Sequence, residues 1–198
     1  MHFATSLLRI LLPAALVLSV SACGVNTVPT KEEAAKASWA EVQNQYQRRS
    51  DLVPNLVATV QGFAKQEQAV LVGVAEARSK ASQVMIDPSK LSDASAIAKF
   101  QQAQDGLSSS LGRLLVTVEK YPDLKSDQNF LTLQSQLEGT ENRISIARRD
   151  YNLAVQDYNT TIRTFPSLIA AKFVYGSEPL APFQATTANA ETAPTVKF

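Results

Sequence analysis

Residues 130–165 read FLTLQSQLEGTENRISIARRDYNLAVQDYNTTIRTF, and this is the most regular stretch of the chain. Apolar, aromatic or small side chains recur in it at alternating steps of three and four residues: Phe130, Leu133, Leu137, Thr140, Ile144, Ala147, Tyr151, Ala154, Tyr158, Thr161 and Phe165. Since an α-helix has 3.6 residues per turn, these positions share one face, as in helices that pack lengthwise on a partner. The stretch therefore predicts one long helix, and we call its apolar face the seam.

The same spacing occurs in two segments further upstream. The first covers about residues 32–83 and includes Trp39, Tyr46, Leu56, Val60 and Val74 on its seam. Pro54 lies inside this segment, where proline lacks an N–H and disturbs the preceding turn. Because the spacing continues through Pro54 without a change of phase, we expect one long helix, kinked near Val53. The second helix follows the turn MIDPSKLSD (residues 85–93), with a cap at Ser92 or Asp93, and ends at Pro122.

The remaining elements complete an all-helical prediction. Residues 167–176, SLIAAKFVYG, predict a short last helix after Pro166, and no segment alternates as a strand would. We therefore predict that residues 32–176 form an all-α, elongated antiparallel bundle of three long helices plus a short fourth, with coiled-coil packing. Residues 177–198 are rich in Pro, Thr and Ala and predict an irregular tail. Phe183, Val196 and Phe198 are candidates to pin that tail to the bundle.

The N-terminus, MHFATSLLRILLPAALVLSVSACG, has the features of a secretory signal. Arg9 precedes an apolar run over residues 10–20, and small residues follow as far as Cys23. Val20-Ser21-Ala22-Cys23 resembles the bacterial lipobox, in which the cysteine is lipidated and becomes the first residue of the mature protein. Cys23 is the only cysteine, so it has no disulfide partner within the chain. We predict a signal peptide over residues 1–22 and a tether over residues 23–31; the alternative is an ordinary signal or an uncleaved anchor with an incidental cysteine.

Lipidation also suggests where the protein resides and what it contacts. Gly24 follows Cys23, rather than the Asp that retains many such lipoproteins at the inner membrane, so we expect the periplasmic face of the outer membrane. The expected partners are the bilayer, through the acylated Cys23, and other envelope proteins. The whole chain has 19 basic and 18 acidic residues, a formal net charge of +1, which gives no electrostatic reason to expect nucleic acid.

Removal of the signal peptide limits the chemistry of the mature chain. It takes Arg9 from the 19 basic residues and none from the 18 acidic residues, so the mature chain is formally neutral. It also removes His2, the only histidine, and thus excludes histidine-assisted catalysis and histidine metal ligands. We expect no cofactor, no metal and no enzymatic activity. A carboxylate metal site is the weakest alternative, and its candidate ligands are Glu67, Glu119, Asp127, Glu138, Glu141 and Asp150.

The dipeptide Tyr-Asn occurs twice, at Tyr151-Asn152 and Tyr158-Asn159, and is the most distinctive polar feature of the seam. A spacing of seven residues places both tyrosines on one helix face. We expect their rings to pack in the bundle and their hydroxyls to find partners on a neighbouring helix. The asparagines flank the seam, in a polar layer that either fixes the helix register or also receives a ligand.

Arg49 occupies a seam position and needs an acceptor if it is buried, for which Glu67 and Glu141 are the candidates. Arg143 and Arg148 lie in the third predicted helix. An alternative function follows from these arginines: together with Arg49 they would bind a small ligand or an anion at the bundle.

Several motifs resemble one bacterial family. These are YQRRSDLVPNLV (residues 46–57), LGRLL (111–115), YPDLK (121–125) and TENRI (140–144), with Tyr151-Asn152 and Phe165-Pro166 following. Over about residues 35–176 the chain resembles the LemA family. This resemblance implies an all-α bundle of long helices and association with a membrane, usually through an N-terminal transmembrane helix, in proteins without an established biochemical role. The family carries no agreed catalytic residues, and the lipobox here replaces that helix.

Overall fold

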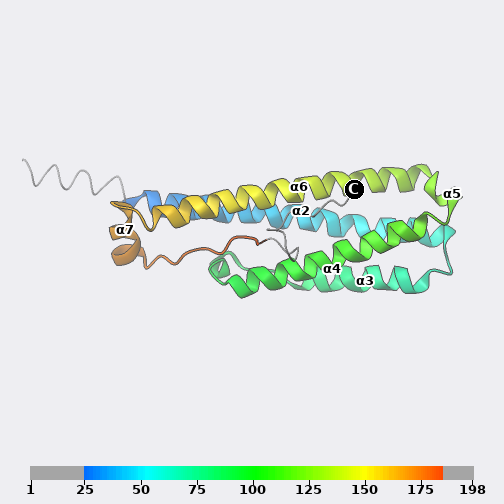
Figure 1. The fold of residues 1–198 in the computed structure, drawn as a ribbon, viewed down its shortest axis with the longest axis horizontal. Coiled ribbons are helices and arrows are strands. Elements are labelled where there is room, and N and C mark those ends of the chain that lie inside the picture. The colour runs from blue at the N-terminus through cyan, green and yellow to red at the C-terminus, as the bar shows by residue number, and fades with distance from the viewer. Residues whose placement is uncertain (1–24, 185–198) are drawn as a thin grey trace, which may run out of the picture.

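A computed structural model describes residues 25–184 as a bundle of helices in the form of a rod (Figure 1). Its long helices are α2 (Thr27–Phe63), α3 (Gln68–Gln83), α4 (Ala94–Val118) and α6 (Gln128–Thr161). The short elements are η1 (Pro88–Lys90), α5 (Pro122–Lys125), α7 (Ser167–Ala170) and η2 (Ala171–Tyr175). The prediction of an all-α bundle is confirmed.

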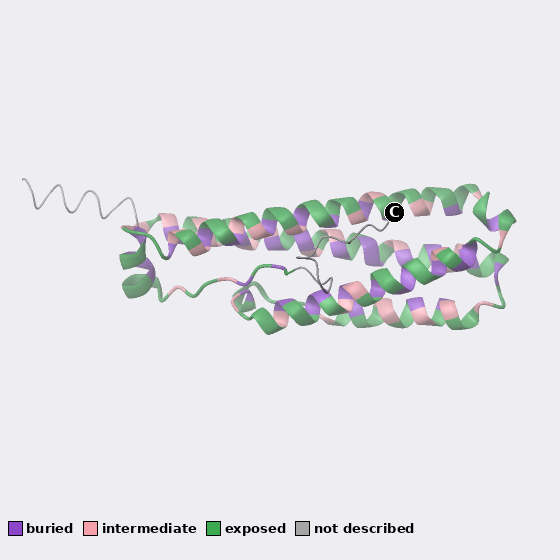
Figure 2. Cartoon of the chain, viewed as in Figure 1, coloured by how far each residue is buried: buried purple, intermediate pink, exposed green. Residues whose placement is uncertain are grey.

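The helices pack as two antiparallel pairs. Helix α2 runs beside α6 for most of its length, and α3 runs beside α4 along one half of the rod (Figure 1). Helices α2 and α3 also contact each other and hold the pairs together. The exposed residues follow the outer faces of the helices, and the buried residues point between them (Figure 2).

The prediction of a single helix over residues 32–83 is wrong in one respect. The chain leaves α2 at Phe63, turns over residues 64–67 and returns as α3, so the bundle has four long helices rather than three. Glu67 N–H donates to the carbonyl of Ala64 within this turn, at 3.1 Å. The apolar spacing continued across the turn because α2 and α3 direct their apolar faces into the same core.

Helix α2 is continuous through Pro54, as its spacing predicted. Proline has no N–H to donate to the carbonyl four residues earlier, which belongs to Ser50. That carbonyl instead accepts a hydrogen bond from Arg78 Nε of α3, at 2.8 Å. The hydroxyls of Ser50 and Ser82 lie 3.1 Å apart in the same contact. The gap left by the proline therefore becomes an attachment point between two helices.

Aspartate side chains begin two of the long helices, and Asp93 is one of the two cap candidates that the sequence offered for α4. Asp93 accepts hydrogen bonds from the backbone N–H groups of Ser95 and Ala96 at the start of α4. Asp127 accepts one from Phe130 N–H at the start of α6, at 2.9 Å. Capping satisfies backbone donors that have no partner within the helix.

The seam of α6 departs from the predicted positions beyond Tyr151. Tyr158 is buried as predicted, but Val155 and Ile162 are buried where Ala154 and Thr161 were expected, and Phe165 is exposed. A straight helix drifts by about 20° per heptad relative to a strict repeat of seven, so the buried face moves to neighbouring positions along a long helix.

The two ends of the described chain also differ from expectation. Helix α2 begins at Thr27, so residues 27–31 of the expected tether are helical. Pro29 is tolerated there because N–H groups in the first turn of a helix have no helical partner. At the other end, residues 177–184 have no regular secondary structure and run back along the bundle (Figure 1). Phe183 pins them as expected, while Val196 and Phe198 lie outside the described residues.

Candidate functional site

Residues 177–184, which we call the C-terminal strap, run along the bundle and are held there by the doubled Tyr-Asn motif. The side-chain amide of Asn152 donates to Phe183 O at 3.1 Å and accepts from Phe183 N at 2.9 Å. Asn159 makes the same pair of bonds with Leu180, at 2.8 and 2.9 Å. Each asparagine thus pairs with the backbone of one strap residue as a neighbouring β-strand would.

The spacing of the two asparagines matches the spacing of the strap residues. Seven residues of helix rise by about 10.5 Å. Three residues of extended chain, from Leu180 to Phe183, span about 10 Å. The distance between the two asparagines on α6 therefore matches the distance between Leu180 and Phe183 on the extended strap. The asparagine amides pair with backbone groups of the strap that have no partner within the strap itself.

Tyr151, which precedes Asn152 on α6, bonds to the same segment, at a residue between Leu180 and Phe183. Its hydroxyl donates to Ala181 O at 2.9 Å. We had expected a partner on a neighbouring helix, but the partner lies on the strap. Burial raises the pKa of Tyr151 well above its ordinary value, as it does for Tyr158 to a smaller extent. Both phenols are buried and act as packing groups, with Tyr158 in a cluster around Val28 and Ile162.

The ring of Phe183 completes an aromatic cluster under the strap. It stacks on Trp39 with ring centres 5.7 Å apart and meets Tyr151 edge to face at 5.6 Å. The guanidinium of Arg148 covers the outer side of Phe183, 4.7 Å from the ring centre. Arg148 therefore contributes to holding the strap.

Two further hydrogen bonds connect the strap to the other helix pair. Ala181 N donates to Leu91 O at 2.8 Å, and Gln101 Nε2 donates to Gln184 O at 2.7 Å. The strap thus bonds to α4 and to the connection before it, as well as to α6. It closes the part of the bundle that α3 does not reach.

Arg49 forms the centre of a separate polar layer. Its side chain is 1% exposed and pairs with Glu141 at 2.6 Å, and Glu141 itself is 45% exposed. Its guanidinium also donates to Ser108 Oγ at 2.7 Å and to both the backbone and side-chain oxygens of Gln104. Gln104 in turn donates to Ala81 O, so this layer joins all four long helices.

The structure separates the other predicted site residues. Glu67, the second candidate partner for Arg49, instead accepts a hydrogen bond from the Tyr121 hydroxyl at 2.9 Å. Arg143 is exposed on α6, apart from the partners of Arg49, and Arg148 lies over Phe183. The two terminal nitrogens of the Arg49 guanidinium bond to protein partners, and its Nε is buried without a hydrogen-bond partner among the described residues, so these arginines do not converge on an open anion site. In residues 25–184 no group of three or more acidic, histidine or cysteine side chains is placed to bind a metal.

An open apolar groove between α4 and α6 was not predicted. It has a volume of about 380 Å³ and is lined by Leu56, Leu111, Leu115 and Leu137, with the acidic residues Glu138 and Glu141 and several polar side chains at its edge. Gly112 also lines it, and a Cβ at that glycine would meet no atom within 4 Å. The one feature of the sequence that pointed to this groove is Leu115, a leucine that lies next to Leu114 and outside the apolar spacing of its helix.

Cys23 and the proposed signal peptide lie outside the described residues. Among the helices of residues 25–184, none is long and apolar enough to cross a bilayer.

Comparison with known proteins identifies relatives of this chain. Magnetosome protein MamQ 2 of Paramagnetospirillum magneticum is 27% identical over 157 residues, which cover 71% of this chain and 58% of that protein. Magnetosome protein MamQ of Magnetospirillum gryphiswaldense is 26% identical over 157 residues, with the same shares. Protein LemA of Metamycoplasma hominis is 26% identical over 124 residues, covering 63% of this chain and 52% of that protein. The chain thus spans between half and three fifths of the length of these relatives.

The sequence model of the LemA family also matches most of the chain, over residues 38–198. This range includes every long helix except the first turns of α2, and it includes the strap. The chain therefore belongs to the LemA family.

Proposed function

We propose that this protein is a membrane-anchored envelope protein of the LemA type, held by an acylated Cys23, and that it acts as a non-enzymatic scaffold. The observation that supports this function best is the open groove between α4 and α6. The long polar side chains buried elsewhere, Arg49 and Gln104 among them, are engaged within the bundle.

The position of the groove fits a scaffold that stands away from a membrane. Helix α2 starts four residues after Cys23 and has 37 residues, which corresponds to a rod of about 55 Å. Leu56, on the floor of the groove, is 29 residues beyond Thr27 and so about 44 Å along that axis. An anchor at Cys23 would therefore present the groove well clear of the bilayer surface.

The lining of the groove indicates the chemistry of its partner. Four leucines provide an apolar floor, and Glu138 and Glu141 lie at the rim. The complementary ligand is a protein segment with a row of apolar side chains flanked by Lys or Arg, such as an amphipathic helix. Apolar burial would supply the affinity, and Glu138 at the rim would favour basic flanks over acidic ones, whereas the charge of Glu141 is already paired with Arg49.

Gly112 allows the groove to be blocked without damage to the bundle. Because there is open space around this glycine, Gly112→Trp fills the groove from within α4. Gly62→Trp is the matched control, since Gly62 is also helical with open space around it but does not line the groove. Both substitutions replace a poor helix former, so both variants should fold with unchanged helical content.

The test is site-specific photocrosslinking in intact cells from Gln134, whose side chain lines the groove. We expect defined adducts with an envelope protein in the wild-type background and with Gly62→Trp, and their loss with Gly112→Trp. If Gly112→Trp and Gly62→Trp give the same adducts as the wild type, the groove is not the partner site.

A further inference from the structure

The short segment α7–η2, at one end of the rod, has its small residues inside and its large apolar residues outside. Its buried residues are Ser167, Ala170 and Ala171. Its large apolar side chains point to solvent: Leu168, Ile169, Phe173, Val174 and Tyr175. A surface helix of a soluble bundle normally has the opposite arrangement.

Exposed apolar residues are concentrated at this place. Of thirteen large apolar side chains exposed within residues 25–184, six lie between positions 165 and 175, and we call these six the apolar tip. The other seven are dispersed along the helices. Phe165 and Phe173 are the most exposed of the tip, at 76% and 78%. A contiguous exposed apolar patch on a soluble protein commonly marks an interaction surface.

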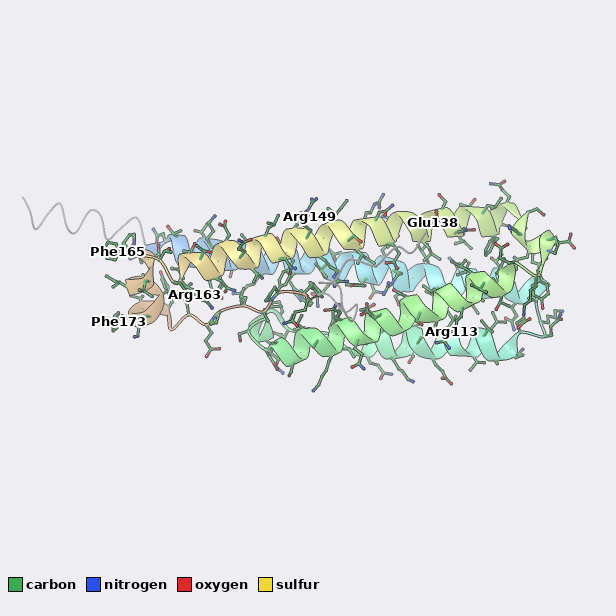
Figure 3. All side chains as sticks on the ribbon, in the orientation of Figure 1. Arg113, Glu138, Arg149, Arg163, Phe165 and Phe173 are labelled. Atoms are coloured by element: carbon green, nitrogen blue, oxygen red, sulfur yellow. The ribbon has the colours of Figure 1, made fainter. Side chains whose placement is uncertain are left out.

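Basic side chains border the apolar tip. Arg163, Phe165 and Phe173 lie together at the end of the rod that carries α7 (Figure 3). The ammonium group of Lys172 lies 5.9 Å from the centre of the Phe173 ring. Aromatic and aliphatic side chains flanked by Arg and Lys are typical of segments that lie in the interface of a membrane. Glu178 is the nearest acidic residue in sequence, and it follows on the strap.

The apolar tip lies at the start of α2. Val28 packs in one cluster with Tyr158, Ile162 and Ala171, which fixes the first turn of α2 against η2 (Figure 1). Thr27 is four residues after Cys23, a distance of at most about 14 Å for an extended chain. If Cys23 carries the lipid of the proposed function, the tip is within reach of the bilayer surface.

We infer that the apolar tip is a second membrane contact, which inserts into the interfacial region of a phospholipid bilayer. Phe165, Ile169 and Phe173 enter the boundary between head groups and acyl chains, and Arg163 and Lys172 meet lipid phosphates. Two contacts at one end of a rod fix its tilt, whereas a single lipid contact leaves it free. The tip would thus orient the groove between α4 and α6 relative to the membrane.

The test uses a polarity-sensitive fluorophore on the full chain with Cys23→Ala, so that the introduced thiol is the only one. Val174→Cys places the probe on the tip, and Val116→Cys is the matched control near the end of α4, with both valines well exposed. Vesicles contain phosphatidylethanolamine and phosphatidylglycerol, with nitroxide-labelled lipid for quenching. We expect a blue shift at position 174 and about threefold stronger quenching there than at position 116.

A second variant separates insertion from simple proximity. Phe165→Glu with Phe173→Glu should abolish the blue shift at position 174, and both rings are too exposed for the change to unfold the bundle, which circular dichroism will check. Equal quenching at positions 174 and 116, or no shift at 174, would overturn the inference. A blue shift at 174 without vesicles would also overturn it, because the tip would then be covered by a second copy of the chain.

This experiment does not depend on the anchor. The Cys23→Ala chain tests the tip directly, so an absent lipid on the wild-type protein would refute the proposed function and leave the result for the tip standing. If the fluorescence at position 174 does not change when vesicles are added, membrane insertion of the apolar tip is refuted, and the proposal that Cys23 is lipidated is unaffected.

Discussion

The strap should detach when the asparagines that hold it are truncated. Asn152→Ala and Asn159→Ala each remove two hydrogen bonds to the backbone of Phe183 or Leu180. A hydrogen bond contributes about 0.5–1.5 kcal/mol net, so two bonds give about 1–3 kcal/mol for each variant. Both asparagines are partly buried, and water will compensate for part of the loss, which favours the lower half of that range.

Hydrogen exchange measures this loss at the bonds themselves. The N–H groups of Leu180 and Phe183 donate to the two asparagines, so their protection reports opening of the strap. A loss of about 1–3 kcal/mol accelerates exchange by about 5- to 150-fold. We expect this acceleration at Leu180 and Phe183, while amides in the middle of α4 keep their protection.

Asn142→Ala provides the matched control on the same helix. Asn142 is exposed and lies beside the groove between α4 and α6, far along α6 from the strap. It should change strap exchange by less than about twofold, since exposed substitutions away from special features cost little. The reasoning is refuted if Asn152→Ala and Asn159→Ala leave exchange at residues 180 and 183 as slow as the control does.

Three other perturbations test the bundle. Arg78→Ala should lower the free energy of unfolding in urea by about 1–3 kcal/mol, because it leaves the Ser50 carbonyl unpaired. The loss should be smaller in a Pro54→Ala background, where the new alanine supplies a helical N–H to that carbonyl, and equal losses in both backgrounds would contradict this. Arg49→Ala should destabilise by about 3–5 kcal/mol, and Glu141→Gln by no more than about 1 kcal/mol because Glu141 is half exposed; similar losses would argue against a buried polar layer. Burial raises the pKa of Tyr151, so the native state holds its proton more tightly than the unfolded state, and stability present below about pH 10 is lost as the pH rises further. In Tyr151→Phe, the free energy of unfolding should fall less steeply between pH 8 and 11.5 than in the wild type. An unchanged slope would mean that other groups cause the alkaline loss of stability.

Periodicity predicted the helices well because their stability comes from one apolar face. The apolar positions of the second predicted helix, from Ile97 to Val118, are buried, and Asp93 caps that helix as one of the two predicted candidates. The turn after Phe63 carried no such signal. Residues 64–67 contain neither glycine nor proline, and both flanking helices direct their apolar residues to the same core.

The strap was less predictable than the helices for a different reason. The asparagines bond to backbone atoms of Leu180 and Phe183, and backbone atoms are the same for every residue type. The seven-residue spacing of the Tyr-Asn motif indicated a shared face but not its partner. Of the three bulky residues that the sequence offered as pins for the tail, Phe183 is the one within the described residues, and it is buried.

The groove and the apolar tip depend on three-dimensional arrangement. Leu56, Leu115 and Leu137 each appear as ordinary seam or near-seam residues, and only the packing of α2, α4 and α6 brings them together at an open groove. Phe165 fits the seven-residue repeat, yet the drift of the helix and the turn at Pro166 leave it exposed.

The most direct measurement of the proposed anchor is the intact mass of the protein extracted from membranes of its host, with fragmentation of its N-terminal peptide. The lipoprotein account predicts a chain that begins at Cys23, lacks residues 1–22, and carries acyl chains on that residue, with membrane retention lost in Cys23→Ala. A mature chain that begins at another residue, or that retains an unmodified Cys23 while bound to the membrane, would contradict it.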